Sequence, residues 1–313
     1  MRIAVLMGGT SEEKEISFLS GNAVLQSLKD QGYDAFTFDP SINNISELKS
    51  QADVAFICLH GGSGEDGTVQ GALESLGIPY TGCDVHASAL CFDKLLTKLL
   101  WMQMDISTPD GLVLSRTEFQ DMIEEYEGDK NSLVLDVDVV YPCIVKPNRS
   151  GSSIGVNKVA SAEGLVSAIE EAFEYSPKVL IEEVILGFEF AITVINGAVY
   201  DIVKIMAPEG NYNLENKYYT DDTEYQYPYH FEDEDMEQQI IESAIRTYQE
   251  FGCSGAIRID FMTNDDETKF FFLEVNTIPG MTSHSLIPKA VESHGINFDQ
   301  LCKIILNEAT ESK

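Results

Sequence analysis

Two apolar stretches near the carboxyl terminus constrain the fold most, because they have the pattern of paired strands. Residues 256–262 and 270–276 are rich in Ile, Phe, Val and Leu, and the polar segment 263–268 separates them. Apolar runs joined by an Asn/Asp-rich turn are typical of an antiparallel hairpin. The sequence therefore predicts that these two strands lie side by side.

Four polar side chains interrupt these strands: Arg258, Asp260, Glu274 and Asn276. Strand side chains have a period of two, so Arg258 and Asp260 share a face, as do Glu274 and Asn276. If the faces coincide, two carboxylates, an amide oxygen and a guanidinium converge, which suits Mg²⁺ shared with substrate phosphates. The alternative is a solvated strand face with a salt bridge. The Gly/Pro/Ser loop at 276–285 favours a functional site, because sites concentrate on such loops.

The charge of the chain excludes some partners. Its 313 residues include 52 acids and 20 bases, a formal net charge of −32. So acidic a chain is a poor candidate for binding nucleic acid or anionic lipid through its general field. The six cysteines form no CxxC pair, which fits buried thiols in a reducing compartment. No segment reaches the ~18 apolar residues of a membrane helix, and the apolar residues 1–7 have the pattern of a buried strand. We expect a soluble cytoplasmic protein.

The first 85 residues alternate predicted strands and helices. The strands are expected at 3–7, 35–38 and 54–59, and the helices at 13–31 and 68–76. Such alternation is typical of an α/β unit with a parallel sheet. Glycine-rich turns follow the first and third strands, at 8–11 and 60–67. Both turns fall at the carboxyl ends of strands, where open α/β sheets bind ligands.

The rest of the chain predicts a smaller α+β unit and an antiparallel sheet. A long helix is expected at 88–104, followed by a helix at 117–126, a hairpin at 141–159 and a helix at 162–175. The antiparallel sheet is expected to contain the opening hairpin and strands at 179–183, 189–195 and 199–205, with helices at 235–251 and 298–309. The polar segment 208–228 has little apolar content. A loop of that length is either wrongly assigned or functional.

A glycine- and serine-rich loop follows Lys146 and runs to Gly155. Its backbone N–H groups and hydroxyls could cradle phosphate, and Lys146 could reach the same anion. It is not a Walker A loop, and it is not a Rossmann fingerprint because no helix follows at once. A structural turn is the alternative interpretation.

Other polar residues lie at the ends of apolar runs or in polar loops. Each has a structural interpretation beside a functional one. Ser11 and Glu13 could simply begin a helix, and a histidine or tyrosine in a loop usually packs or is satisfied locally. These candidates are Glu13, His60, Glu182, Glu183, Lys217 and Tyr218.

Together the motifs resemble those of the D-alanine–D-alanine ligases, a family of the ATP-grasp superfamily. The resemblance depends on His60-Gly-x-x-Gly-Glu-Asp-Gly67 and on Arg258-Ile-Asp … Glu-x-Asn-Thr-x-Pro-Gly-Met281, and it runs nearly end to end. It implies an ATP-grasp fold, α/β and α+β in class. An N-terminal Rossmann-like parallel α/β domain would span 1–94, a small central α+β lid domain 95–180, and a C-terminal antiparallel-sheet catalytic domain 181–313. ATP would lie between the last two.

The resemblance implies roles for residues around ATP and two Mg²⁺ (or Mn²⁺) ions. The resemblance assigns the phosphates to Lys94 and Lys146, the γ-phosphate to Lys217, and the lid over them to Ser152 and Ser153. It assigns the base to Glu182 with the backbone of Glu183 to Ile185, and the ribose to Glu189. The metal ligands it implies are Asp260, Glu274 and Asn276.

The resemblance also implies residues for two D-alanine substrates. Glu13 and His60 are assigned to the first D-alanine, and Ser285 and Leu286 to the carboxylate of the second. Arg258 and the Gly280 N–H are assigned to the oxyanion. Glu13, Ser152 and Tyr218 are assigned to a hydrogen-bonded link over both substrates. The implied reaction makes D-alanyl phosphate and then D-alanyl-D-alanine for peptidoglycan precursors in the bacterial cytoplasm. A homodimer is implied by the same analogy.

Three alternatives stay open from sequence. An acceptor such as D-lactate or D-serine is one, and Tyr218 argues for D-alanine because Phe accompanies D-lactate use in the family. A dinucleotide-dependent oxidoreductase would need GxGxxG, and only Gly8-Gly9 is present. A non-enzymatic nucleotide sensor would have lost the metal ligands, which are intact. Departures from the family pattern at Ser63, Ser150, Glu183 and Phe188 leave the lid and the adenine pocket open in detail.

Overall fold

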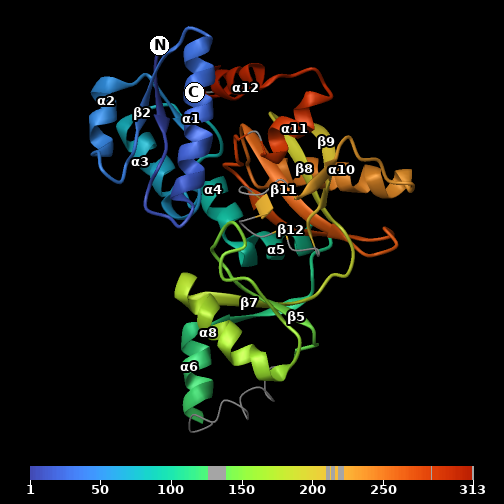
Figure 1. Cartoon of the computed structure of the whole chain (residues 1–313). Helices are drawn as coiled ribbons and strands as arrows, with labels where there is room; N and C mark the ends of the chain where they lie inside the picture. The colour runs from blue at the N-terminus through green and yellow to red at the C-terminus, as the bar shows by residue number, and fades with distance from the viewer. Residues whose placement is uncertain (126–138, 209–211, 213–215, 218–221, 283, 312–313) are drawn as a thin grey trace.

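The computed structural model describes residues 1–125, 139–208, 212, 216–217, 222–282 and 284–311. Three sheets form the molecule: an amino-terminal sheet, a central sheet and a carboxy-terminal sheet. Figure 1 shows the central sheet as a separate lower unit beneath the other two. Along the chain the first sheet is parallel and the two later sheets are antiparallel, which agrees with the predicted mixture of α/β and α+β structure.

The amino-terminal sheet has the order β2-β1-β3 and is parallel throughout. Its elements are β1 (Arg2–Leu6), α1 (Lys14–Asp30), β2 (Asp34–Phe38), α2 (Leu48–Gln51), β3 (Val54–Ile57) and α3 (Thr68–Leu76). Residues 3–6 and 54–57 are fully buried because helices or loops cover both faces. The predicted alternation is confirmed.

The expected helix at 88–104 is wrong, because the chain breaks it at Asp93. Two helices form instead, α4 (Val85–Phe92) and α5 (Lys94–Gln103). Asp93 has an extended backbone, and its carboxylate accepts a hydrogen bond from the Leu96 N–H. Aspartate is a strong N-cap residue. The break directs the amino terminus of α5 toward the central sheet, where Arg149 also binds Asp93.

The central sheet has the antiparallel order β4-β7-β5-β6. Its strands are β4 (Gly111–Ser115), β5 (Cys143–Pro147), β6 (Asn157–Val159) and β7 (Lys178–Glu183). The helices α6 (Arg116–Glu125) and α8 (Leu165–Tyr175) share an apolar core with it. The hairpin at 141–159 is confirmed, whereas the assignment of 179–183 to the later sheet is wrong. β7 pairs with β4, a strand that the sequence pattern did not indicate.

The carboxy-terminal sheet has the antiparallel order β10-β9-β8-β11-β12. Its strands are β8 (Glu189–Ile195), β9 (Ala198–Met206), β10 (Glu224–Gln226), β11 (Ala256–Thr263) and β12 (Phe270–Asn276). The predicted hairpin is therefore confirmed. β10 lies inside the segment expected to be a loop, and residues 209–211, 213–215 and 218–221 of that segment lie outside the described residues.

Opposite faces of this sheet have different cores. The helix α10 (Glu234–Glu250) packs against one face through Ile192 and Ile240. On the other face, α11 (Leu286–Glu292) packs against Ala191 and Val203 through Leu286. Asp260 pairs with Ala191, so it belongs to the α11 face. The alternation of β11 thus buries its isoleucines under α10 and leaves its charged side chains on the other side.

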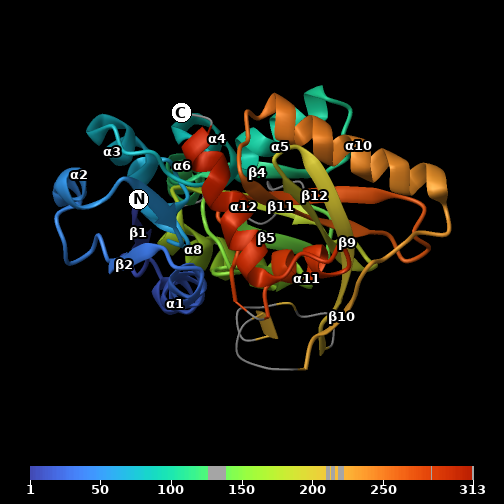
Figure 2. The ribbon, with the colours of Figure 1, turned by 90° about the horizontal axis from the view of Figure 1, so that it is seen from above.

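The last helix, α12 (Phe298–Glu311), connects the first and third sheets. Leu301, Ile305 and Leu306 share a core with β1, β3 and the end of β8. Figure 2 shows α12 between the two sheets. Helix α11 was not expected, whereas α12 was. None of the helices in the described parts of the chain has the length and apolar character that crossing a membrane requires.

Candidate active site

The hairpin β11–β12 brings its four polar side chains together. Arg258 is opposite Asn276, and Asp260 is opposite Glu274. The Arg258 guanidinium donates from Nε to Asp260 Oδ1 at 2.6 Å and from Nη2 to Oδ2 at 2.8 Å. Asn276 Nδ2 donates to Asp260 Oδ2 at 3.1 Å. The two strand faces therefore coincide, as the sequence analysis required for a site.

Lysines from other elements complete the charge of this cluster. Lys94, at the start of α5, lies 3.0 Å from Glu274 Oε2 and donates to the Ser150 carbonyl at 2.6 Å. Burial raises the pKa of Glu274, but Lys94 and then Lys217 outweigh it and bring that pKa to about 2. Glu274 is thus ionised at neutral pH. Lys146, from β5, also lowers this pKa, so the central and carboxy-terminal sheets contribute to one site.

The hairpin fits a hard cation that shares its ligands with a phosphate. The Asn276 amide nitrogen is used on Asp260, which leaves its oxygen as the donor to a metal. Over the described residues no group of three or more His, Cys, Asp or Glu side chains could hold a metal by itself. Two carboxylates and an amide oxygen correspond to Mg²⁺ sites in which substrate oxygens supply the remaining ligands.

Glu182 forms a second charged cluster at the end of β7. Lys146 Nζ lies 2.6 Å from Glu182 Oε2, and Lys98 Nζ lies 2.8 Å from Oε1. All three side chains are buried. Glu183, by contrast, is exposed and accepts the Asp110 N–H at 3.0 Å. Ile185 is half-buried in the loop that follows.

Glu189 lies on the same side of the carboxy-terminal sheet as Asp260. Its pKa is raised to about 7, first by burial and then by the charges of Asp260 and Glu274, which Lys217 opposes. Lys217 lowers the pKa of Glu274 and of Glu13 as well. Lys217 therefore lies among three predicted site carboxylates, although it comes from the polar segment between β9 and β10.

Glu13 forms a separate compartment beside the hairpin. The Ser152 hydroxyl donates to Glu13 Oε1, which joins the amino-terminal and central units as predicted. A Cβ placed on Gly151 would lie 2.5 Å from Glu13 Oε2, so a larger residue here would displace the Glu13 carboxylate. Burial and then Glu65 raise the pKa of Glu13. Ser152 and Ser153 have φ of 49° and 59°, a strained conformation typical of functional loops.

His60 lies in the same compartment and depends on Ser20, a residue that the sequence analysis missed. The Met281 N–H donates to Ser20 Oγ at 3.2 Å, and Ser20 Oγ lies 3.0 Å from His60 Nε2. A hydroxyl has one proton, and among the described contacts His60 Nε2 is its acceptor. The proton of neutral His60 is then on Nδ1, which lies 3.8 Å from Glu65 Oε1. Sequence gave no signal for Ser20, because only the fold brings α1 against both loops.

These groups line a cavity of about 20 Å³, roughly the size of one water molecule. The cavity is lined by Glu13, His60, Glu65, Gly151, Ser152, Lys217, Arg258, Glu274, Asn276, Ile278, Pro279 and Gly280. Ser285 lies at the start of α11, where its hydroxyl accepts the Thr282 N–H at 2.9 Å. The Leu286 side chain packs into the core, so a ligand would meet its backbone. Tyr218 lies outside the described residues.

The facing sheets, the lysines between them and the acidic hairpin define the ATP-grasp class of ligase. The family descriptions "D-ala D-ala ligase N-terminus" and "D-ala D-ala ligase C-terminus" match residues 39–83 and 100–307. The chain is 45% identical to the D-alanine–D-alanine ligase of Paracidovorax citrulli, with 99% of this chain and 90% of the relative covered. It is 42% identical to that of Acidovorax ebreus, with coverage of 99% and 91%.

Solved structures give the same result. A D-alanine–D-alanine ligase from Bacillus anthracis has a TM-score of 0.80 at 31% identity, covering 100% of this chain and 98% of that one. The VanG D-Ala:D-Ser ligase from Enterococcus faecalis has a TM-score of 0.81 at 30% identity, with coverage of 98% and 99%. The chain belongs to the D-alanine–D-alanine ligase family and is an enzyme of the ligase class.

Proposed function

We propose that this enzyme joins two D-alanines to D-alanyl-D-alanine, with ATP converted to ADP and phosphate through a D-alanyl phosphate. The observation that supports this most is the contact between two compartments. The Arg258–Asp260–Glu274–Asn276 cluster suits metal and phosphate, and the Glu13–Ser152–His60 compartment, beside it, offers polar groups that could bind a small amino acid. An acyl phosphate formed between them would be at hand for the second substrate.

ATP would lie between segments 95–180 and 181–313. A solved structure of the Bacillus anthracis enzyme complexed with ATP, 30% identical to this chain, supports ATP as the nucleotide. Lys94, Lys146 and Lys217 would neutralise the phosphates, while Glu182, the backbone of 183–185 and Glu189 would hold the base and ribose. Ser152 and Ser153 would cover the phosphates. Two Mg²⁺ or Mn²⁺ ions on Asp260, Glu274 and Asn276 would supply further charge neutralisation, on which phosphoryl transfer depends.

The second step is attack of the acceptor amine on the acyl phosphate. Arg258 and the Gly280 N–H would stabilise the tetrahedral oxyanion, and one such donor is typically worth ~3 kcal/mol. Ser285 and the Leu286 backbone would hold the acceptor carboxylate. The Ser152 bond to Glu13 closes the compartment, and exclusion of water protects an acyl phosphate from hydrolysis. Tyr218 would extend this bond over the substrates.

A second candidate acceptor is D-serine, which the similarity to the VanG ligase supports at 30% identity. The relatives at 42–45% identity are all named D-alanine–D-alanine ligases. Tyr218 argues against D-lactate, but it does not separate D-serine from D-alanine, since both attack through an amine. On the strength of those relatives, D-alanine is the acceptor we propose.

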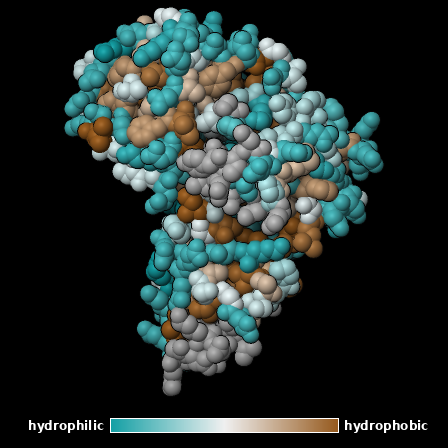
Figure 3. Space-filling model, viewed as in Figure 1, coloured by the Kyte–Doolittle hydropathy of each residue, from teal (hydrophilic) through white to brown (hydrophobic). Residues whose placement is uncertain are grey.

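We also propose a homodimer in the bacterial cytoplasm, making peptidoglycan precursor. Helix α5 exposes Leu96, Leu99, Leu100 and Met102, which are 43%, 51%, 37% and 61% exposed. Figure 3 shows apolar surface where the central unit joins the rest of the molecule. A contiguous apolar face of this kind is typical of a subunit contact. Light scattering of the wild type and of Leu99→Lys would test it.

Release of phosphate from ATP tests the activity. Purified protein with Mg²⁺ should release phosphate with D-alanine and give D-alanyl-D-alanine by mass spectrometry. Release with D-lactate, D-serine or L-alanine should be much slower. A product dominated by D-alanyl-D-serine would overturn the acceptor while retaining the ligase class. An absence of nucleotide-dependent product with all four would overturn the function.

A further inference from the structure

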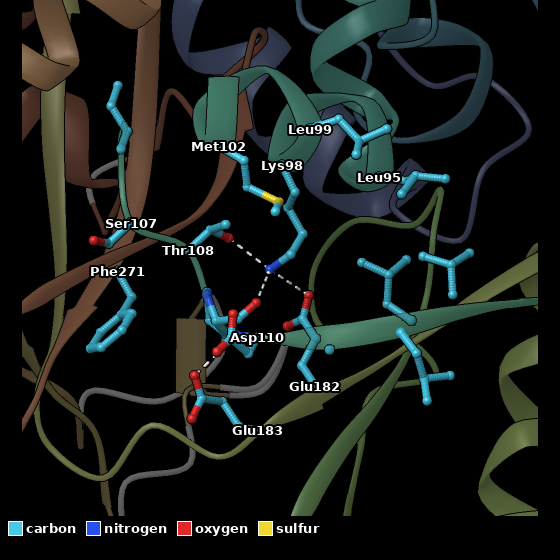
Figure 4. Close-up of a pocket in the computed structure, with 16 residues that line it drawn as sticks. Leu95, Lys98, Leu99, Met102, Ser107, Thr108, Asp110, Glu182, Glu183 and Phe271 are labelled. Atoms are coloured by element: carbon cyan, nitrogen blue, oxygen red, sulfur yellow. Dashed lines mark hydrogen bonds and ion pairs between the residues drawn. The ribbon is translucent and has the colours of Figure 1, made fainter. Parts of the chain in front are cut away.

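Lys98 lies behind Glu182, at the wall of a cavity that Glu182 and Glu183 also line. The cavity has a volume of about 500 Å³ and lies between α5, the linker that leads into β4, and β7. Figure 4 shows Lys98 reaching from α5 toward Glu182, with Leu95, Leu99 and Met102 on the same helix. Lys98 itself is 8% exposed, so its charge is held inside the protein.

The ammonium group of Lys98 has an acceptor for each of its protons. Its Nζ lies 2.7 Å from Thr108 Oγ1, 2.8 Å from the Pro109 carbonyl and 2.8 Å from Glu182 Oε1 (Figure 4). A lysine ammonium donates three hydrogen bonds and accepts none. Lys98 thus donates two hydrogen bonds to the linker and forms a close ion pair with Glu182, whose Oε1 has no other hydrogen-bond partner among the described residues.

These contacts fix both the charge and the direction of Glu182. Lys98 holds one carboxylate oxygen and Lys146 holds the other. Burial raises the pKa of Glu182, but Lys146 and then Lys98 outweigh it, so that this pKa lies below its ordinary value. An ionised carboxylate only accepts hydrogen bonds. Glu182 can therefore accept a hydrogen bond from a base with an exocyclic amine, as in adenine. It would repel a base with a carbonyl oxygen at that position, as in guanine.

The same lysine fixes the linker against the site. Thr108 and Pro109 lie just before β4, which pairs with β7, the strand that contains Glu182. Gly111 is opposite Glu182 in that pairing. Lys98 thus joins α5, the linker and the end of β7 around one carboxylate, so a change at Lys98 is transmitted to the base-binding edge.

We propose that Lys98 is a positioning residue that sets nucleotide-base selection by holding Glu182 as a fixed, acceptor-only carboxylate. This rests on the proposed function, in which Glu182 meets the adenine. It separates the two neighbouring lysines by role. Lys146 has contact with the nucleotide, whereas Lys98 acts through Glu182 alone.

A double-mutant cycle with Lys98→Met and Glu182→Gln tests this, since methionine keeps the apolar stem beside Leu95 and Met102. Lys98→Met should raise KM for ATP roughly tenfold, as expected for a lost charge-assisted hydrogen bond, with kcat and KM for D-alanine changed less than about twofold. The preference for ATP over GTP in kcat/KM should fall roughly tenfold as well. In the Glu182→Gln background, Lys98→Met should have little further effect, because coupled residues are not additive.

Two further variants separate positioning from a general loss of structure. Leu99→Met changes the same cavity wall without touching Glu182, and should leave KM for ATP and base preference unchanged. Thr108→Val removes one of the three Lys98 acceptors, and should shift base preference in the same direction by a smaller factor. Thermal unfolding of each variant shows whether it folds, and Thr108→Val carries the test if Lys98→Met does not.

Calorimetric titration with ATP and with GTP makes the test independent of turnover. Equal effects of Lys98→Met in the wild-type and Glu182→Gln backgrounds would show that Lys98 does not act through Glu182, and so would an unchanged base preference. Wild-type protein that binds ATP but makes no product would overturn the proposed reaction alone. Protein that binds neither nucleotide would overturn both.

Discussion

The hairpin β11–β12 and the Glu13 compartment shift the pKa of the same kind of side chain in opposite directions. Glu274 has Lys94 at 3.0 Å, and its pKa is about 2 although burial would raise it. Glu13 is buried against Gly151 and near Glu65, and its pKa is raised, with burial the largest cause. Environment, not residue type, therefore separates a carboxylate suited to metal and phosphate from one whose pKa is raised.

Glu189 shows that the two states exist even on one sheet face. It shares this face with Asp260, yet its pKa is raised to about 7 because burial and the neighbouring carboxylates outweigh Lys217. Glu274 has a lysine of its own within ion-pair distance. The difference teaches that the position of the lysines, more than the number of acids, decides which oxygens are available to a cation.

The largest expected effect is on turnover, and it comes from a change at Glu274, the ionised carboxylate of the hairpin. Glu274→Gln removes the charge that Lys94 and a metal would share, so it should lower phosphate release by roughly 100-fold or more, about 3 kcal/mol in the barrier. The protein should still fold, as judged by circular dichroism. Asp266→Asn, in the exposed turn of the same hairpin, removes an equal charge and should keep activity. Near-normal turnover of the Glu274 variant at saturating Mg²⁺ would contradict the metal assignment.

The second effect is on the Glu13 side of the comparison. Gly151→Ala would place a Cβ 2.5 Å from Glu13 Oε2, and nothing in the Gly151 backbone otherwise forbids alanine. Displacement of Glu13 should lower kcat/KM by roughly 10- to 100-fold, because small misplacements at a reacting site are costly.

Gly164→Ala is the matched control for that variant. Its Cβ would meet Val159 Cγ1 at 3.5 Å, an ordinary contact in the same unit. It should leave the kinetics unchanged. Equal activity of both alanine variants, measured by phosphate release, would show that the close approach of Gly151 to Glu13 has no catalytic value.

The third effect is on stability and depends on pH. Glu189 has a folded pKa of about 7 against an ordinary 4.5, so the folded state holds its proton more tightly than the unfolded state does. Its contribution to folding is therefore fully present at low pH and is lost as pH rises from about 4.5 through about 7. Glu189→Gln should stabilise the protein by about 1–3 kcal/mol at pH 8 and by little at pH 4.

Glu274 should behave in the opposite way. Its folded pKa of about 2 lies below the ordinary 4.5, so its contribution is present above about 4.5 and is lost as pH falls toward 2. Glu274→Gln should therefore destabilise the protein near neutral pH. Urea unfolding of both variants at pH 4 and pH 8 checks the signs. Destabilisation by Glu189→Gln at pH 8 would show that the two carboxylates do not differ as described.

The sequence predicted the hairpin side of the comparison much better than the Glu13 side. Alternation along 256–262 and 270–276 determines both the strand faces and the meeting of Asp260 with Glu274. The break at Asp93, the strand β4 and helix α11 depend on capping and tertiary pairing, which periodicity does not record. The sequence pattern also did not mark Lys98 as a buried or functional residue, since a lysine in an amphipathic helix usually faces solvent.

Contacts among segments far apart in the chain explain the remaining gap. Ser20 and His60 are 40 positions apart, and Ser20 and Met281 are 261 apart. Nothing local marks such a serine as different from its neighbour Ser17, which is equally buried in α1. Resemblance to a family assigns residues to the substrates, whereas only the fold shows which residues hold those side chains in place.

The smallest effect concerns one such residue. Ser20→Ala removes the hydroxyl that bonds His60 Nε2 and leaves the Met281 N–H without its acceptor, so kcat should fall several-fold, about 1 kcal/mol. Ser17→Ala is the matched control. Its hydroxyl is also buried and donates to the Cys58 carbonyl at 2.7 Å, without touching His60. Both variants should lose similar stability, but only Ser20→Ala should alter His60.

Nitrogen NMR of histidine-labelled protein reads the tautomer directly, and a His60→Gln variant identifies the signal among the five histidines. The wild type and Ser17→Ala should show the proton on Nδ1, because a hydroxyl with one proton and one acceptor leaves Nε2 bare. Ser20→Ala should shift the population toward Nε2–H. A wild-type His60 protonated on Nε2 would contradict the Ser20 bond, and would make His60 a base toward the substrate instead of a donor. The Glu13 compartment would then hold two proton acceptors, and its contrast with the ionised hairpin would depend on Glu13 alone.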